Sequence, residues 1–250
     1  MDCLPCRAGQ HLSGTLFNAE VEIGNYAEML RITPDSNNVL YLVNDYTADT
    51  VDLYVAPIAG GTDPKKLNGM LSSGGEVDSY TLRQYLISSD SSYVVYSAIE
   101  STTSFSELYA VNIDGTEEQK LNDILPSLSE VVSFNIDEFS DKVVYTQQNL
   151  ENMEMYSVNR DGTRRVLLSN TSSRDRALLT GDGRVVFQAD INGTDGIFVM
   201  SVTGGEISTV LAILSDRKVY GFELSPTGKT IFVRGDIRQY GIIEVFQYDI

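Results

Sequence analysis

Carboxylates are the main side chains of this chain that could perform acid–base chemistry, since it has 35 Asp and Glu but one histidine, His11. A single histidine, in a segment that we expect to complete a sheet, argues against a serine–histidine–aspartate arrangement. Hydrolysis of a glycosidic bond needs two carboxylates flanking a cleft. The carboxylates near predicted inner strands are Asp137, Glu138 and Glu223. Because tryptophan is absent and no acidic motif of such enzymes is present, we favour a protein without catalytic activity.

Oxygen-bearing side chains gather in two predicted loops, at residues 44–49 and 190–196. Ca²⁺ takes six to eight oxygen ligands, and the candidate ligands are Asp190, Asn192 and Asp195. The spacing departs from that of a calcium loop, because one extra residue precedes the final Asp-Gly and no bidentate glutamate follows at the required offset. We therefore favour an ordinary polar hairpin loop, with Ca²⁺ as the only cofactor considered.

The two cysteines, Cys3 and Cys6, form a Cys-x-x-Cys pair. A zinc site needs four ligands, and the chain offers only His11 besides this pair. Arg7 follows the pair, which excludes haem attachment, and the βαβ context of a redox pair is absent. A local disulfide or a disordered terminal segment are the interpretations that remain.

Short apolar runs with an aromatic anchor recur along the chain. The anchors are Tyr41, Tyr96, Tyr145, Phe187 and Phe232, separated by 55, 49, 42 and 45 residues. A second aromatic follows each anchor by 11 to 14 residues, at Tyr54, Tyr109, Tyr156, Phe198 and Phe246. Turn-forming residues precede each run, so the pattern predicts short antiparallel strands. An acidic residue stands two positions before the second aromatic at Asp52, Glu107, Glu154 and Glu244, where we expect structural hydrogen bonds within each hairpin.

Four short strands per unit of about 40 to 55 residues are typical of a β-propeller blade. We therefore expect one all-β domain over residues 1–250, with four-stranded antiparallel blades near 20–70, 75–124, 128–171, 174–213 and 217–250. The fifth unit lacks an outer strand, and residues 7–14 resemble the outer-strand ends at 66–69 and 120–123. We predict that residues 7–14 complete the last blade and close a five-bladed ring. The alternative is a piece of a longer chain with six or more repeats.

The motif Ser225-Pro226-Thr227-Gly228-Lys229 and the strand after it resemble the "S-P-D-G-K-x-I-x-F" element of the TolB-like, or WD40-like (PD40-type), β-propeller repeats. Residues 107–116 are similar to that family's "[DE]-[IL]-Y-x-x-x-x-D-G" strand and turn. The third and fourth units depart from the pattern, and the family's rings are more often six-bladed. The resemblance implies a rigid scaffold, usually periplasmic or extracellular, that binds proteins or accompanies a separate catalytic domain.

The charge balance excludes several classes of partner. Lys and Arg number 18 against 35 Asp and Glu, which gives a net charge of −17. Such a chain repels phosphate backbones and anionic lipid, so we expect neither nucleic acid nor a membrane surface as its partner. No apolar run reaches the roughly 20 residues that span a bilayer, and the first seven residues lack the pattern of a signal peptide.

We therefore expect a monomeric, non-catalytic scaffold for protein–protein interaction that binds through the inter-strand loops on one face. The candidate binding residues are Asp45, Tyr46, Asp49, Glu100, Asp190, Asp195, Asp236 and Tyr240. Tyrosines in loops suit a recognition surface. The alternative is a carbohydrate-active propeller, a glycoside hydrolase or a lectin, that uses carboxylates in its channel.

Overall fold

The computed structural model describes residues 26–45, 48–71, 74–78, 85–100, 105–126, 128–149, 152–170 and 172–250. In these residues the regular elements are all β-strands, and no helix is long and apolar enough to cross a membrane. The strands form five antiparallel sheets in succession along the chain. This arrangement confirms the all-β propeller that the repeats predict.

Each blade is a meander in which strands adjacent in sequence pair with one another. The first blade contains β1 (Tyr26–Ile32), β2 (Asn38–Asp45), β3 (Thr50–Pro57) and β4 (Lys65–Lys66). In the second, β5 (Glu76–Val77) and β6 (Tyr85–Ile87) both pair with β7 (Tyr93–Ile99), and β8 (Ser106–Asn112) and β9 (Gln119–Lys120) follow. The third contains β10 (Glu130–Asp137), β11 (Lys142–Gln148), β12 (Met153–Asn159) and β13 (Val166–Ser169). The fourth contains β14 (Ser172–Leu179), β15 (Arg184–Ile191), β16 (Thr194–Ser201) and β17 (Ser208–Ala212), and the last contains β18 (Val219–Leu224), β19 (Thr230–Gly235) and β20 (Glu244–Asp249).

A polar side chain holds the turn before the second long strand of each blade, at one repeated position. These residues are Thr33, Ser88, Asp137, Thr180 and Ser225. Thr33 Oγ1 accepts the backbone N–H of Asn38 at 3.0 Å, and Ser225 Oγ accepts that of Thr230 at 3.2 Å. Local bonds of this kind favour a turn over further pairing. We call the edge of the blades with these turns the turn side, and the edge with the β2–β3, β7–β8, β11–β12, β15–β16 and β19–β20 connections the loop side.

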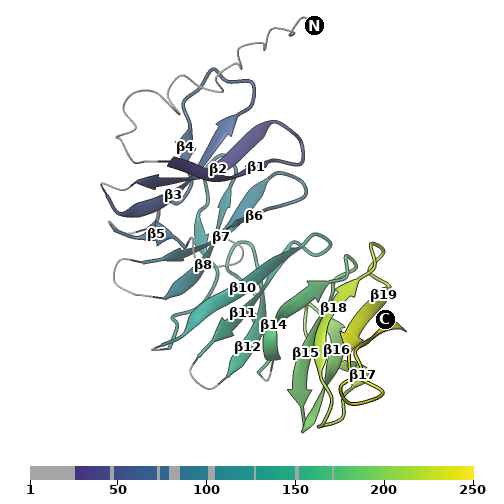
Figure 1. Cartoon of the computed structure of the whole chain (residues 1–250). Coiled ribbons are helices and arrows are strands. Elements are labelled where there is room, and N and C mark those ends of the chain that lie inside the picture. The colour runs from purple at the N-terminus through teal and green to yellow at the C-terminus, as the bar shows by residue number, and fades with distance from the viewer. Residues whose placement is uncertain are drawn as a thin grey trace, which may run out of the picture.

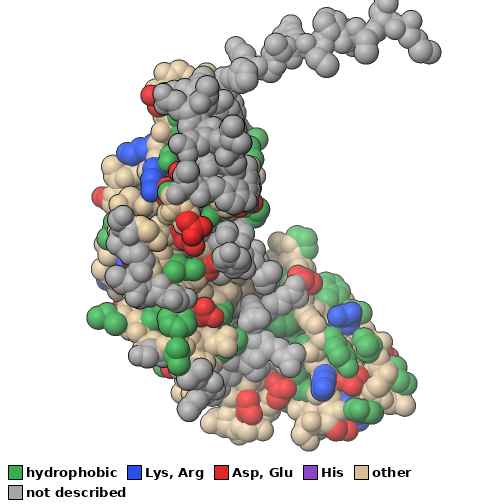
Figure 2. All heavy atoms as spheres, turned by 60° about the vertical axis from the view of Figure 1, so that its left-hand side comes forward, with side chains coloured by type: hydrophobic (Ala, Val, Ile, Leu, Met, Phe, Trp, Pro, Cys, Tyr) green, Lys and Arg blue, Asp and Glu red, His purple; other side chains and the backbone are tan. Residues whose placement is uncertain are grey.

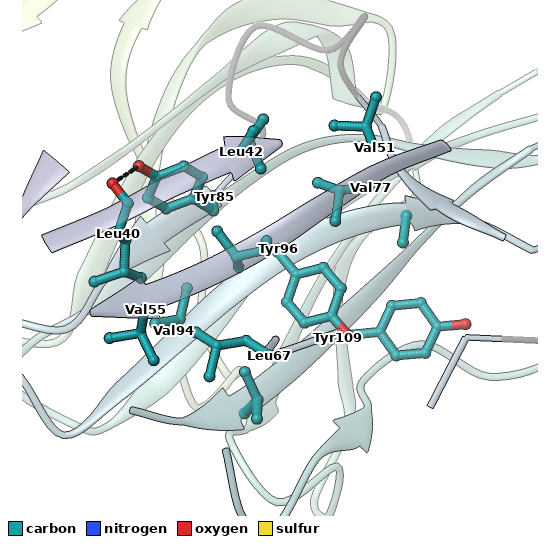
Figure 3. Packing of buried hydrophobic residues seen from close by; sticks show 13 residues of the cluster. Leu40, Leu42, Val51, Val55, Leu67, Val77, Tyr85, Val94, Tyr96 and Tyr109 are labelled. Carbon is teal, nitrogen blue, oxygen red and sulfur yellow. Dashed lines mark hydrogen bonds between the residues drawn. The ribbon is translucent and has the colours of Figure 1, made fainter. Parts of the chain in front are cut away.

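The core lies between neighbouring blades, because alternate side chains of a strand point to opposite faces of its sheet. The leading face of a blade carries the aromatic pair and packs on the preceding blade, and the trailing face packs on the next one. Leu40 on the first trailing face packs in one buried cluster with Tyr96 and Tyr109 of the second blade (Figure 3). Leu53 on the same face belongs to this cluster. The two tyrosine rings stack with centroids 5.4 Å apart. Three further clusters repeat this arrangement along the chain.

In the last blade, the residue at the anchor position lies one place later in the chain than the sequence predicts. Val233, rather than Phe232, pairs with Phe246 and packs against the fourth blade. Val233 also stands eight positions after the turn residue Ser225, the spacing that the first two blades show between turn residue and anchor. Phe232 as the fifth anchor is therefore wrong, because a shift of one residue moves a side chain to the opposite face.

The five blades follow an arc, with the first and last blades at its two ends (Figure 1). A view turned by 60° shows the same open shape (Figure 2). The last blade has three described strands, and β20 forms its outer edge. The predicted closing segment, residues 7–14, lies outside the described residues, as do Cys3, Cys6 and His11. Closure of a five-bladed ring therefore stays a prediction.

Candidate binding site

A cavity of about 700 Å³ lies on the turn side between the second and third blades. Its walls come from the start of β7, the end of β8 with its following turn, the β10–β11 turn and the end of β12. A smaller cavity of about 200 Å³ adjoins it. Both are lined by Tyr93, Asp141 and Arg160, which therefore form the centre of the candidate site.

Arg160 covers the ring of Tyr93. Its guanidinium carbon lies 5.3 Å from the ring centroid, and its Nε lies 3.4 Å from Oδ2 of Asp141. Tyr93 is buried, and this burial, followed by the charge of Asp141 and a hydrogen bond to it, raises the pKa of the Tyr93 hydroxyl. The ring is therefore a neutral aromatic wall at physiological pH, held between a cation and a carboxylate.

Five carboxylates line the two cavities, whereas Arg160 is the one cationic side chain among their described lining residues. The carboxylates are Glu117, Asp141 and Asp161 in the larger cavity, and Asp90 and Glu138 in the smaller one. The hydroxyl of Thr163, and then its backbone N–H, lower the pKa of Asp161. The hydroxyl of Ser88, and then a backbone N–H, lower that of Asp90. Both carboxyls are ionised at neutral pH, so the site is electronegative around Arg160.

Two departures from the repeat build the centre of the site. Tyr93 begins the second long strand of its blade, where the other blades have Asn38, Lys142, Arg184 and Thr230. The turn at residues 159–163 repeats the sequence of residues 112–116, with Arg160 in place of Ile113. Tyr93 and Arg160 lie in contact because the second and third blades are neighbours. Neither Tyr93 nor Arg160 is among the residues predicted from the sequence, although a residue that breaks a repeat is a detectable signal.

The arrangement suits a cationic group. A lysine ammonium or an arginine guanidinium can form charge-assisted hydrogen bonds with carboxylates and lie on an aromatic face. Arg160 already binds in this way inside its own chain. An anionic ligand would meet repulsion from the surrounding carboxylates.

The carboxylates predicted for catalysis occupy two separate places. Asp137 is fully buried, and its Oδ2 accepts both the backbone N–H and the hydroxyl of Ser140, so it holds the β10–β11 turn. Glu138 is exposed in the same turn and lines the smaller cavity. Glu223 is exposed on β18 of the last blade, with the fourth blade between it and the other two.

The predicted binding residues lie on the loop side, opposite the cavity. Across the second blade the two sides are separated by β7, whose seven residues span about 20 Å. Asp45 Oδ1 accepts the N–H of Ala48 at 3.1 Å, and Glu100 accepts the hydroxyl of Tyr109 at 2.7 Å. Asp195 lies 3.5 Å from the side-chain nitrogen of Gln188, and Asp236 accepts the backbone N–H groups of Lys218 and Gly241. Asp49, Asp190 and Tyr240 are exposed. Tyr46 lies outside the described residues.

The predicted calcium loop is a tight hairpin. Asp190 pairs across the strands with Asp195, and two residues, Asn192 and Gly193, form the turn with φ of 54° and 79°. Positive φ at both positions is typical of a type I′ turn. The loop is thus a polar hairpin turn. In the described part of the chain, no group of three or more His, Cys, Asp or Glu could hold a metal ion.

Three of the four repeated acidic residues before the second aromatic, Asp52, Glu107 and Glu154, make structural contacts within their blades, and the expectation for Glu244 stays a prediction. Asp52 lies 2.7 Å from Nζ of Lys66 and accepts the side-chain N–H of Asn68 at 2.8 Å. Glu107 pairs with Lys120, and Glu154 accepts the hydroxyl of Tyr156 at 2.7 Å. These contacts tie the third strand of a blade to its neighbours.

No family model and no curated protein matches the chain by sequence. Solved structures do match. A protein assigned as TolB from Agrobacterium tumefaciens has a TM-score of 0.52 and 16% identity, over 90% of this chain and 78% of that one. Dipeptidyl peptidase 4 from Porphyromonas gingivalis has a TM-score of 0.69 and 11% identity, over 89% of this chain and 37% of that one. An oligogalacturonate lyase from Vibrio parahaemolyticus has a TM-score of 0.58 and 12% identity, over 87% of this chain and 60% of that one.

These likenesses show the β-propeller fold. The matched proteins carry different activities by their names, and the chain spans well under two thirds of the peptidase. A shared fold supports many unrelated functions, so function has to be argued from the site.

Proposed function

We propose that this chain is a non-catalytic β-propeller scaffold that binds another protein, and that the cavity between its second and third blades receives a basic side chain of that partner. The observation that carries the proposal is that five carboxylates line the two cavities together with Tyr93 and Arg160. A partner's guanidinium or ammonium would compete with Arg160 for Asp141 and approach Glu117 from the open side of the cavity.

The loop side supplies a second part of the proposed binding surface. Its exposed residues, such as Asp49, Asp190 and Tyr240, come from different blades and could contact an extended partner. We also infer, from the resemblance of the repeats, a periplasmic or extracellular location. The carbohydrate-active alternative is less well supported, because Asp137 is engaged in a turn and Glu223 lies on another blade.

Titration with short basic peptides tests the cavity directly. Isothermal calorimetry with a lysine- and arginine-containing peptide should show binding that weakens about tenfold when Glu117→Gln and Asp141→Asn are combined, since two charge-assisted contacts are lost. The matched control combines Glu206→Gln with Asp249→Asn, which removes the same charge from exposed positions elsewhere. Equal weakening by both pairs would reduce the effect to net charge, and peptide binding that neither pair alters would place the ligand elsewhere.

A further inference from the structure

The trailing face of a blade has two positions that are buried in every interface between blades. On the second long strand they are Leu40, Val95, Val144 and Val186, and on the third Leu53, Leu108, Met155 and Ile197. All eight side chains are at most 1% exposed. These positions therefore mark where one blade accepts another.

The same two positions are exposed on the last blade. They hold Phe232, which is 41% exposed, and Val245, which is 67% exposed. Tyr220 on β18 is 46% exposed, and the guanidinium carbon of Arg234 lies 6.0 Å from its ring. No described strand covers this trailing face, so it is an apolar sheet surface with the pattern of a blade interface.

The charge of the last blade also differs from that of the others. Residues 217–250 carry five basic and four acidic side chains and so have a net charge of +1. Because the whole chain has a net charge of −17, residues 1–216 have a net charge of −18. Two copies that met through their first four blades would repel each other strongly. Two copies that met through their last blades would keep these acidic regions farthest apart.

We propose that the trailing face of the last blade binds the same face of a second copy of this chain, in a two-fold symmetric dimer. Phe232 and Val245 of each copy would be covered by those of the other, as the equivalent positions are covered by the next blade within the chain. Arg234 and Glu223 lie on this same face of the sheet. In a two-fold symmetric contact, Arg234 of one copy can therefore approach Glu223 of the other.

A head-to-tail arrangement is disfavoured, because it would need the leading face of the first blade. That face is already buried, with Val39 at 5%, Tyr41 at 2% and Ala56 at 0% exposure. Among the described residues, the last blade is therefore the one that offers this pattern to another copy, and closure of the five-bladed ring, which would bring the first blade onto the same face, is the arrangement that competes with the dimer. We expect a weak association, with a dissociation constant on the order of 10–100 µM, as for interfaces at the small end of the size range.

Sedimentation equilibrium of the whole chain, from about 5 to about 200 µM, tests the proposal. The weight-average mass should rise with concentration toward twice that of the monomer, and Phe232→Glu should abolish the rise. Phe139→Glu is the matched control, because Phe139 is 70% exposed in the β10–β11 turn of the third blade. Val245→Glu is the second test if Phe232→Glu impairs folding.

A chain that stays monomeric over the whole range would overturn the proposal, as would a dimer that tolerates both Phe232→Glu and Val245→Glu. A dimer lost equally in Phe139→Glu would also overturn it, since another surface would then be responsible. The outcome does not depend on the cavity between the second and third blades, so this proposal and the proposed function can fail separately.

Discussion

Tyr93 and Arg160 illustrate how single residues can give a repeat protein a specific site. Each departs from its equivalents in the other blades, and the fold places one above the other at an interface between blades. Elsewhere the repeated residues satisfy the blade itself. Asp52 pairs with Lys66, and Asn68 and Asn122 accept backbone N–H groups of the third strand at 2.9 and 2.7 Å. Side chains that recur at the same position of several blades form structural contacts. Side chains that differ from their equivalents in the other blades are therefore the first to test for function.

Arg160→Ala is expected to strengthen binding of a basic peptide about three- to tenfold, because it removes the internal cation that occupies Asp141 and the Tyr93 ring. It should also lower the free energy of unfolding by about 0.5–1 kcal/mol through the lost ring contact. Calorimetry and urea unfolding would measure the two effects. Lys229→Ala removes one charge from an exposed turn of the last blade and should change the affinity little. Weaker binding by Arg160→Ala would mean that Arg160 itself contacts the ligand.

Strand register decides which element-level predictions hold. Turn residues and aromatic runs locate all five blades, because their periodicity follows from the four-stranded meander. The anchor of the last blade fails because Phe232 and Val233 are both good strand residues, and only pairing with Phe246 shows which one faces the fourth blade. The cavity could not be located from one blade alone, since its walls belong to two blades.

Two Asp-Gly-Thr turns, at residues 114–116 and 161–163, should make stability depend on pH. The threonine hydroxyl and backbone N–H lower the pKa of Asp114 and Asp161 below the ordinary 3.8. A carboxyl whose pKa is lower in the folded state stabilises above its unfolded value, and this contribution is lost as pH falls through the folded pKa. Burial raises the pKa of Glu76 and Glu118, so these two act in the opposite sense and favour folding as pH falls.

Asp161→Asn keeps an acceptor for the turn but removes the titrating charge. The variant should therefore lose less free energy of unfolding than the parent protein between about pH 5 and about pH 2.5, measured by urea unfolding at each pH. Thr62→Ala, in the exposed β3–β4 connection, changes no titrating group, so it provides the control and should follow the parent curve. Parallel curves for Asp161→Asn and the parent would show that the turn does not contribute to acid sensitivity.

The whole molecule is an arc whose two ends differ. The first blade buries its leading face, while the last blade exposes its trailing face and carries the smallest share of the negative charge. Composition predicts an acidic protein, and uneven charge is visible along the sequence. Which surface remains exposed depends on how the blades pack on one another, and this packing can be seen only in the structure.

Closure at the outer edge of the last blade is the remaining prediction at this scale. If residues 7–14 pair with β20, deleting residues 1–14 removes a strand's backbone hydrogen bonds and its leucine contact, and should lower the melting temperature by about 4–8 °C. Deleting residues 1–6 removes Cys3 and Cys6 but keeps the predicted strand, so it should leave the melting temperature within about 1 °C. Calorimetric scans of the parent and both deletions would measure this. Equal melting of all three chains would show that β20 is not completed by these residues, and that the blades are stable as an open arc.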